Sequence, residues 1–220
     1  MASYELSAFD RFHAVSVVGA IEQQTPHTLN VGFWIRDPNQ LIIWPQEVAA
    51  HPRQDFLWEE TCFEIFIGVH GEDFYREINL SPSQAWQTYQ FEEYRYPESM
   101  PPLVAYDIEL NHLKRTHYGL NVSLDLGQFM QQHHLKWANL YLGLTAVLKT
   151  KDGMQYYAMQ HSGQNADFHN KRDWLHTVLK IKSEKLILAF FINFMKLNLV
   201  ISCFVPRFNR IIFSAFQTLT

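Results

Sequence analysis

The sequence predicts an all-β protein, an antiparallel β-sandwich. Short segments rich in β-branched and aromatic residues follow one another, and turn signals separate them about every ten residues. The segment 125–135 is the one convincing helix candidate. With 220 residues, 47% hydrophobic and 15% aromatic, the chain suits a single well-filled folded domain.

Turn chemistry places the boundaries between the expected strands. Asp37-Pro38-Asn39 and Lys151-Asp152-Gly153 are turn signals, because proline fixes φ and Asp-Gly suits positive φ. Three prolines within 96–102 exclude that stretch from a ladder. The expected strands are 13–21, 28–36, 41–44, 61–67, 74–80, 86–94, 104–110, 118–124, 139–148, 154–159 and 174–181.

The hairpin formed by 61–67 and 74–80 carries the strongest functional signal. Side chains alternate across a strand, so Cys62, Glu64 and Phe66 share one face. Glu77 and Asn79 share the equivalent face of the partner strand. The opposite faces, with Phe63, Ile65, Ile67, Ile78 and Leu80, are typical of a core. We therefore expect polar groups to meet on one side of this sheet, close to the aromatic run 86–94.

Composition argues against several classes of protein. The net charge is −4 and no basic cluster occurs, which disfavours nucleic-acid binding. The two cysteines, Cys62 and Cys203, lie far apart in sequence, so a disulfide framework or zinc knuckle is not supported. The first residues lack the basic and apolar regions of a secretory signal, so we expect a cytoplasmic protein.

The last part of the chain differs in character. We expect a β-sandwich domain over 1–182, followed by an apolar, helical tail with basic flanks over 183–220. Residues 186–205 are long enough to span a bilayer, but Lys196 near the middle makes insertion costly. A membrane tether, a hydrophobic helix packed on the domain, and an extension without a role stay open.

Two blocks of sequence resemble a known family. LWEETCFEIFIG with YREINLSPSQAWQTYQFEEYR, and the later YYAMQHSGQNADFHNKRDW, are similar to bacterial DOMON-like domains. Their superfamily includes family nine carbohydrate-binding modules and cytochrome haem domains. The resemblance covers residues 4–181 and implies an antiparallel sandwich with a ligand cleft on one sheet. Some members bind sugars there and others bind haem.

The preferred hypothesis is a non-enzymatic module that binds a saccharide or a saccharide-containing metabolite. Sugar sites need flat aromatic surfaces and a few fixed polar groups for the hydroxyls. The six-residue spacing of Trp58 and Glu64 resembles the tryptophan-then-acid pattern of the family nine site. Two glutamates on adjacent strands would repel each other, so we expect a cation, a sugar or an arginine between them. The candidate ligand-binding residues are Trp58, Glu64, Glu77, Asn79, Trp86, Tyr89 and Arg95.

Two alternatives remain at this stage. A b-type haem needs axial ligands, and Met159 and His161 would share a strand face, with His169 nearby. A glycoside-processing enzyme would use Glu64 and Glu77, which as a cross-strand pair would be about 5 Å apart, as in retaining glycosidases. No metal site is expected, since the histidines form no tight cluster, and the preferred hypothesis requires no cofactor.

Overall fold

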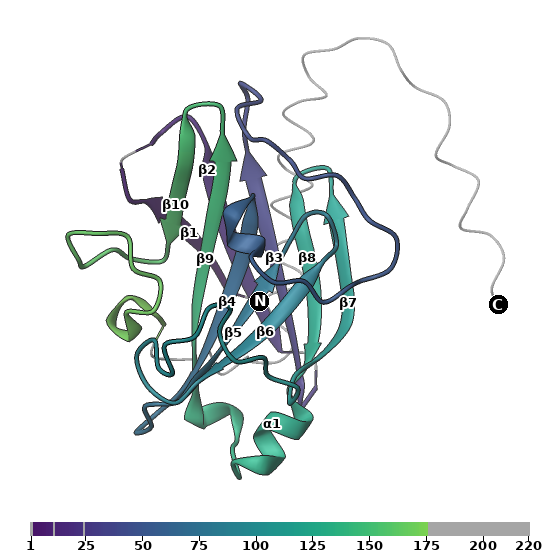
Figure 1. Ribbon diagram of the computed structural model, residues 1–220, viewed down its shortest axis with the longest axis vertical. Helices are drawn as coiled ribbons and strands as arrows, with labels where there is room; N and C mark the ends of the chain where they lie inside the picture. Colours follow the sequence, from purple (N-terminus) through teal and green to yellow (C-terminus); the bar gives the residue numbers. More distant parts are fainter. Residues whose placement is uncertain (1, 11, 24, 176–220) are drawn as a thin grey trace, which may run out of the picture. The chain divides into compact units, whose positions relative to one another are not determined.

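A computed structural model describes residues 2–10, 12–23 and 25–175, and within them it confirms the all-β class (Figure 1). Ten strands pair antiparallel in the order β6-β5-β4-β9-β10-β1-β2-β3-β8-β7. The strands are β1 (Ala2–Ala8), β2 (Ser16–Gln23), β3 (Thr28–Arg36), β4 (Cys62–Val69), β5 (Tyr75–Leu80), β6 (Trp86–Phe91), β7 (Glu109–Thr116), β8 (Gly119–Asp125), β9 (Leu140–Thr150) and β10 (Gly153–Ala158).

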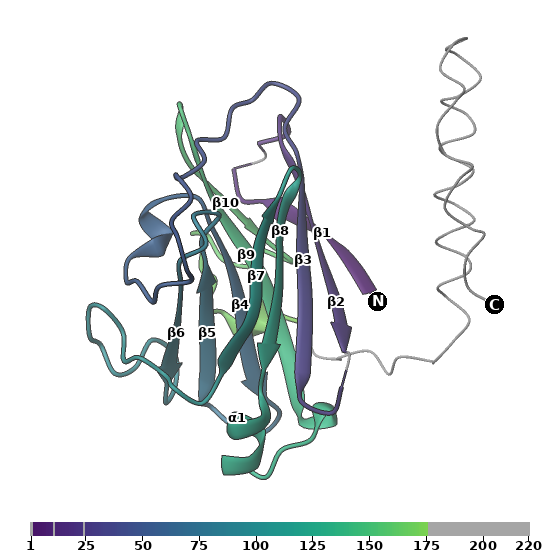
Figure 2. The same ribbon diagram turned by 90° about the vertical axis from the view of Figure 1, so that its right-hand side faces the viewer.

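The ladder bends back on itself to make the two layers of the sandwich (Figure 2). We call β6-β5-β4-β9-β10 the front sheet and β1-β2-β3-β8-β7 the back sheet. Their only strand pairing is short, with Ser7 opposite Ala158 and Ala8 opposite Tyr157 in the described part of the chain. The predicted sandwich is therefore one continuous curled sheet whose halves face each other.

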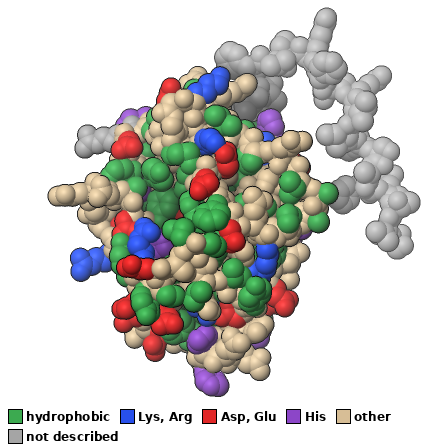
Figure 3. All heavy atoms as spheres, viewed as in Figure 1, with side chains coloured by type: hydrophobic (Ala, Val, Ile, Leu, Met, Phe, Trp, Pro, Cys, Tyr) green, Lys and Arg blue, Asp and Glu red, His purple; other side chains and the backbone are tan. Residues whose placement is uncertain are grey.

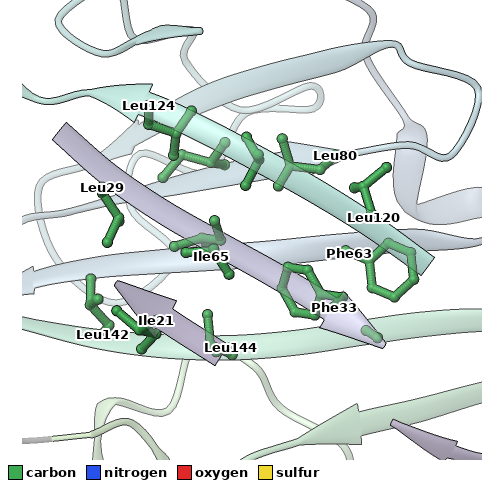
Figure 4. Close-up of a cluster of buried hydrophobic side chains, with 14 of the residues drawn as sticks. Ile21, Leu29, Phe33, Phe63, Ile65, Leu80, Leu120, Leu124, Leu142 and Leu144 are labelled. Carbon is green, nitrogen blue, oxygen red and sulfur yellow. The ribbon is translucent and has the colours of Figure 1, made fainter. Parts of the chain in front are cut away.

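The main core lies between the two sheets (Figure 4). Phe33 of the back sheet stacks on Phe63 of the front sheet, with ring centroids 4.8 Å apart. Ile65, Ile78 and Leu80 are fully buried in the same core, as their strand parity predicts. Burial of this apolar surface is the main force that holds the layers together.

One helix and three 3₁₀ turns complete the described fold. The helix α1 (Gly127–Gln132) falls inside the predicted range 125–135, and its Phe129 and Met130 are buried. The turns are η1 (Leu57–Glu59), η2 (Trp137–Asn139) and η3 (Lys171–Asp173).

Several predicted strand positions were wrong. The strand expected at 104–110 begins at Glu109 and runs to Thr116, because β7 is an edge strand whose exposed polar side chains hide its pattern. The strand expected at 41–44 is reduced to a single bridge between Ile42 and Thr150. The strand β1 was not predicted from the sequence. At 174–181, Leu175 bridges Leu142, and the residues after 175 lie outside the described range.

Long loops cover the outer face of the front sheet. Every residue of β4 and β5 is buried, although only one face of each strand meets the back sheet. The covering segments are 45–61, 92–107 and 159–175. The last of them ends beside β9, where the Trp174 ring lies so close to Gly143 that a Cβ there would come within 2.7 Å of it. This coverage creates an enclosed second face.

The predicted tail, 183–220, and the apolar stretch 186–205 lie outside the described residues. Within 2–10, 12–23 and 25–175, no helix has the length and apolar character needed to cross a membrane.

Candidate ligand-binding cleft

A cleft of about 540 Å³ opens on the outer face of the front sheet. This volume lies in the range of small-molecule sites, which is about 300–1,000 Å³. Figure 3 views this side of the molecule, where hydrophobic side chains gather among acidic and basic ones. The cleft is lined by Trp58, Glu64, Glu77, Phe91, Arg95, Pro97, Glu98, Ser99, Met100, Pro102, Val147, Tyr156, Ala166, Phe168 and His169.

Two carboxyl groups from adjacent strands form the polar floor. Glu64 on β4 is 3% exposed, and its Oε2 accepts a hydrogen bond from the Thr145 hydroxyl at 2.9 Å. Glu77 on β5 is 5% exposed, and its Oε1 accepts a bond from the Asn79 amide at 2.6 Å. Burial raises the pKa of Glu64 to about 8 and that of Glu77 to about 7, and the charge of Glu77 further raises the pKa of Glu64. Both groups therefore titrate near neutral pH.

His169 comes from the covering segment 159–175 and lies against the floor. Its Nε2 is 3.6 Å from Oε2 of Glu77, and its Nδ1 is 2.7 Å from the Tyr75 hydroxyl. Burial, followed by the nearby charge of Arg95, lowers the pKa of His169 to about 3, so the ring is neutral.

The tautomer of His169 follows from its partner. Burial raises the pKa of Tyr75, so the phenol keeps its proton. The Tyr75 oxygen already accepts a bond from the Arg95 backbone N–H at 3.2 Å, and its own proton can therefore go to Nδ1 of His169. We infer that Nε2 carries the ring proton and points it at Glu77.

Aromatic side chains form the walls. Trp58, on η1, is half-buried, and its ring meets Tyr89 edge-on at 5.7 Å and Phe56 at 5.4 Å. Tyr89 is fully buried and donates its hydroxyl proton to Asp55 at 2.9 Å, which ties the loop before η1 to β6. The strand β6 thus fixes the position of the loop that presents Trp58.

Arg95 lies at the rim of the cleft. Its guanidinium donates to Asp167 at 3.0 Å, and its side chain is half exposed. The Tyr94 hydroxyl donates to the other oxygen of Asp167 at 2.9 Å. These contacts fasten segment 159–175 to the loop after β6, so Arg95 both lines the cleft and holds its cover in place.

The structure brings four of the seven predicted ligand residues into the cleft: Trp58, Glu64, Glu77 and Arg95. Asn79 and Tyr89 lie beneath it and support Glu77 and the Asp55 loop. Trp86 is a correction. It pairs with Leu80, so it points into the main core, where it is 7% exposed and stacks under Arg53 at 4.2 Å. Counting by twos from Tyr89 along β6 would have excluded it.

The proposed haem ligands do not come together in the cleft. The strand β10 ends at Ala158, so Met159 and His161 do not share the strand face on which their pairing depended. Nε2 of His161 lies 3.0 Å from the Ser7 carbonyl oxygen, and Met159 packs beside the main core. Within the described residues, no three His, Cys, Asp or Glu side chains are grouped to hold a metal ion.

The strand register corrects the expected pairing of the two glutamates. Glu64 lies directly opposite Asn79, and Glu77 lies opposite Phe66. The two glutamates are therefore diagonal neighbours, whose Cα atoms are typically about 7–8 Å apart. The direct cross-strand pairing behind the 5 Å expectation is not present.

Several cleft residues were not assigned to a sugar site from the sequence. His169 was considered only beside the haem ligands, and Phe91, Tyr156 and Phe168 were not considered. Phe91 could have been found by parity, since it shares a face with Tyr89. His169 and Phe168 lie on an irregular loop, for which periodicity gives no signal.

The fold and the cleft together define an all-β, sandwich-type protein with a ligand-sized hollow on one sheet. No protein-family model matches the sequence, and no curated protein matches it significantly. Among solved structures, a crystal structure from Bacteroides uniformis has a similar fold; that protein is described as a "putative carbohydrate-binding protein". The TM-score is 0.54 at 11% sequence identity, covering 79% of this chain and 84% of that chain. This likeness shows a shared fold.

Proposed function

We propose that this protein is a non-enzymatic, DOMON-like module that binds a saccharide or a saccharide-containing metabolite in the front-sheet cleft. The observation that carries the proposal is the joining of Trp58, Glu64 and Glu77 around one hollow of about 540 Å³. Sugars are recognised by this combination of a flat aromatic surface and a few convergent polar groups. The description of the Bacteroides uniformis protein supports the same class of ligand.

Each lining residue has a defined part in the proposed binding. Trp58 offers an indole against the C–H face of a pyranose. Glu64 and Glu77 accept hydrogen bonds from hydroxyls, or donate one when protonated, because both titrate near pH 7. His169 directs its Nε2 proton toward Glu77 from 3.6 Å, while the amide of Asn79 holds that carboxyl in place. Arg95 supplies donors at the rim.

A glycan array followed by calorimetry tests the proposal. We expect a saccharide hit whose affinity falls at least about tenfold in Trp58→Ala and in Glu64→Gln, the size of effect that one good stacking or charged contact gives. Trp34→Ala and Glu109→Gln are matched controls on the back sheet, where both side chains are exposed. Equal losses in the controls, or none in Trp58→Ala and Glu64→Gln, would contradict the proposed site.

A glycoside-processing enzyme is the second candidate, because the raised pKa values of Glu64 and Glu77 are of the kind that acid–base catalysts have. Turnover of aryl glycosides that disappears in Glu77→Gln would establish it. Binding without turnover would support the module.

A further inference from the structure

We propose that the saccharide bound in this cleft carries a free, protonated amine, and that its ammonium group lies between Glu64 and Glu77. This inference rests on the proposed function and adds the chemical class of the ligand. It comes from the cleft floor, where two carboxyl groups are enclosed together and no Lys or Arg of the described residues forms an ion pair with either.

The hydrogen bonds to the two carboxyls leave acceptors free on the cleft side. Glu64 accepts one bond among the described residues, from the Thr145 hydroxyl to Oε2. Glu77 accepts the Asn79 amide at Oε1, while its Oε2 faces His169 at 3.6 Å, longer than a hydrogen bond. Thr145, Asn79 and His169 are all neutral. The remaining oxygens line a cleft that is open to a ligand.

The charged groups around the floor have other partners. The guanidinium of Arg95 donates to Asp167 and is half exposed. Lys171 donates to the backbone carbonyls of Glu72 and Asp73. Arg95 lines the same cleft and its charge lowers the pKa of both glutamates, but it forms no ion pair with either. Among the described residues the nearest basic partner of Glu77 is the neutral His169, and Glu64 has no ion pair.

The other titratable groups that surround the two carboxyls in the described part of the chain supply no positive charge. Cys62 is fully buried, and burial raises the pKa of its thiol well above the ordinary value. Burial likewise raises the pKa of Tyr75 and of Tyr89, so both phenols stay neutral. Asp55 and Glu98 add negative charge, and Asp55 already accepts bonds from Tyr89 and Gln87. A ligand cation would favour the ionised forms of both carboxyls.

A primary ammonium fits this floor better than a hydroxyl does. It offers three N–H donors and a full positive charge, and hydrogen bonds between charged partners are roughly twice as strong as neutral ones. Placing it between the two carboxyls lowers both of their pKa values. An amino group itself loses its proton near neutral pH, so the proton count is clear at pH 6, where the ligand arrives as the ammonium. There the two carboxyls, with pKa values of about 8 and 7, release on the order of one to two protons on binding. N-acetylation of the sugar would remove both the charge and the two extra donors.

Calorimetry on the full chain tests the inference with three oligosaccharides of equal length: a chitosan oligomer with free amines, its fully N-acetylated counterpart, and a cello-oligomer. We expect the chitosan oligomer to bind about tenfold or more tightly than the other two at pH 6, where its amines are protonated before binding. Measurements in buffers of different ionisation enthalpy should show proton release for the chitosan oligomer alone. Binding of a neutral oligomer as tightly, or amine binding without proton release, would overturn the inference and leave the proposed function intact. Failure of every saccharide here and on the array would instead remove the proposed function.

A double variant shows whether the preference for the amine comes from Glu64 and Glu77 or from the overall negative charge of the protein. In the double variant Glu64→Gln/Glu77→Gln we expect the preference for the amine to fall to less than about twofold, with Glu109→Gln as the matched surface control. If the double variant keeps the full preference, the ammonium is bound elsewhere and the inference is wrong. The proton-release measurement on the unaltered protein decides the question even if the double variant does not fold.

Discussion

The outer faces of the two sheets differ in what covers them. On the back sheet, buried residues are interspersed with half-buried or exposed ones along β3 and β8, and Trp34 on the outer side is 39% exposed. On the front sheet, β4 and β5 have no exposed residue, and the outward side chains include Glu64 and Glu77 at 3% and 5% exposure. Alternating polar residues therefore make a solvated face on one sheet, and an enclosed floor on the other. The loops decide which polar face can become a site.

The largest expected effect is a loss of stability when an outward-facing but buried residue of the front sheet is truncated. Phe66 is fully buried and packs against Trp174 and His169, with ring centroids 5.1 and 5.3 Å away. We expect Phe66→Ala to lower the free energy of unfolding by about 3–5 kcal/mol, because it leaves a cavity. Trp34→Ala, on the back sheet, should cost about 1 kcal/mol or less. Denaturant titration measures both, and equal costs would remove the distinction between the two faces.

A second test compares an ion pair in each sheet. Arg76 on β5 makes a buried, bidentate contact with Asp107, with a shortest distance of 2.7 Å. We expect Asp107→Ala to cost about 3–5 kcal/mol, because Arg76 is left buried without its partner. The pair of Arg115 on β7 with Glu47 is longer, 3.9 Å, and more exposed. Glu47→Ala should cost less than about 1 kcal/mol. A small loss for Asp107→Ala in urea titration would show that water reaches Arg76.

The pH dependence of stability sharpens the comparison further. The carboxyls of Glu64 and Glu77 have pKa values of about 8 and 7 in the folded protein, against 4.5 for an ordinary glutamate. Between pH 4.5 and these values the folded state therefore binds more protons than the unfolded state. Stability must therefore fall as pH rises through this window, by about 2 kcal/mol between pH 6.5 and 8. His169, with its pKa lowered to about 3 from 6.5, acts oppositely, but most of its contribution is gained below pH 6.5 and little is added above it.

Urea titration at pH 6.5 and pH 8 measures this loss. The double variant Glu64→Gln/Glu77→Gln should show a flat profile over the same range, while Glu109→Gln on the back sheet should keep the slope. A stability that rises from pH 6.5 to pH 8 would show that the two carboxyls are ionised in the folded protein.

The smallest expected effect concerns the support of His169. Tyr75→Phe removes the hydroxyl that binds Nδ1 of His169 and the Arg95 backbone N–H. We expect a loss of about 1 kcal/mol in stability. In nitrogen NMR spectra, His169 should change from the pure Nε2–H form to a mixture of tautomers. Tyr118→Phe, at an exposed turn of the back sheet, is the control. An Nδ1–H form in the unaltered protein would contradict the assigned hydrogen bond.

Strand parity predicted much of this molecule from its sequence. The positions of Glu64, Glu77 and the core residues Phe63 and Ile65 follow from alternation, because one face of each strand had to be apolar. Along β6 the same alternation places Tyr89 and Trp86 on opposite faces. The sequence prediction did not apply it there, and so assigned Trp86 to the wrong face.

The cover of the cleft could not be predicted in the same way. Segment 159–175 has no periodic pattern, and its place depends on distant contacts, such as the Arg95–Asp167 pair and the packing of Trp174 on Gly143. The edge strand β7 was misplaced for a related reason, since its exposed polar residues carry no hydrophobic alternation. Local sequence therefore predicts which groups share a sheet face, while long-range contacts determine whether that face is enclosed.

The most direct test of the account is a crystal structure of the protein with the tightest-binding saccharide from the array. We predict a pyranose ring against Trp58, with polar atoms of the sugar within hydrogen-bond distance of Glu64 and Glu77. A saccharide bound instead on the outer face of the back sheet, with the front cleft left empty, would contradict it.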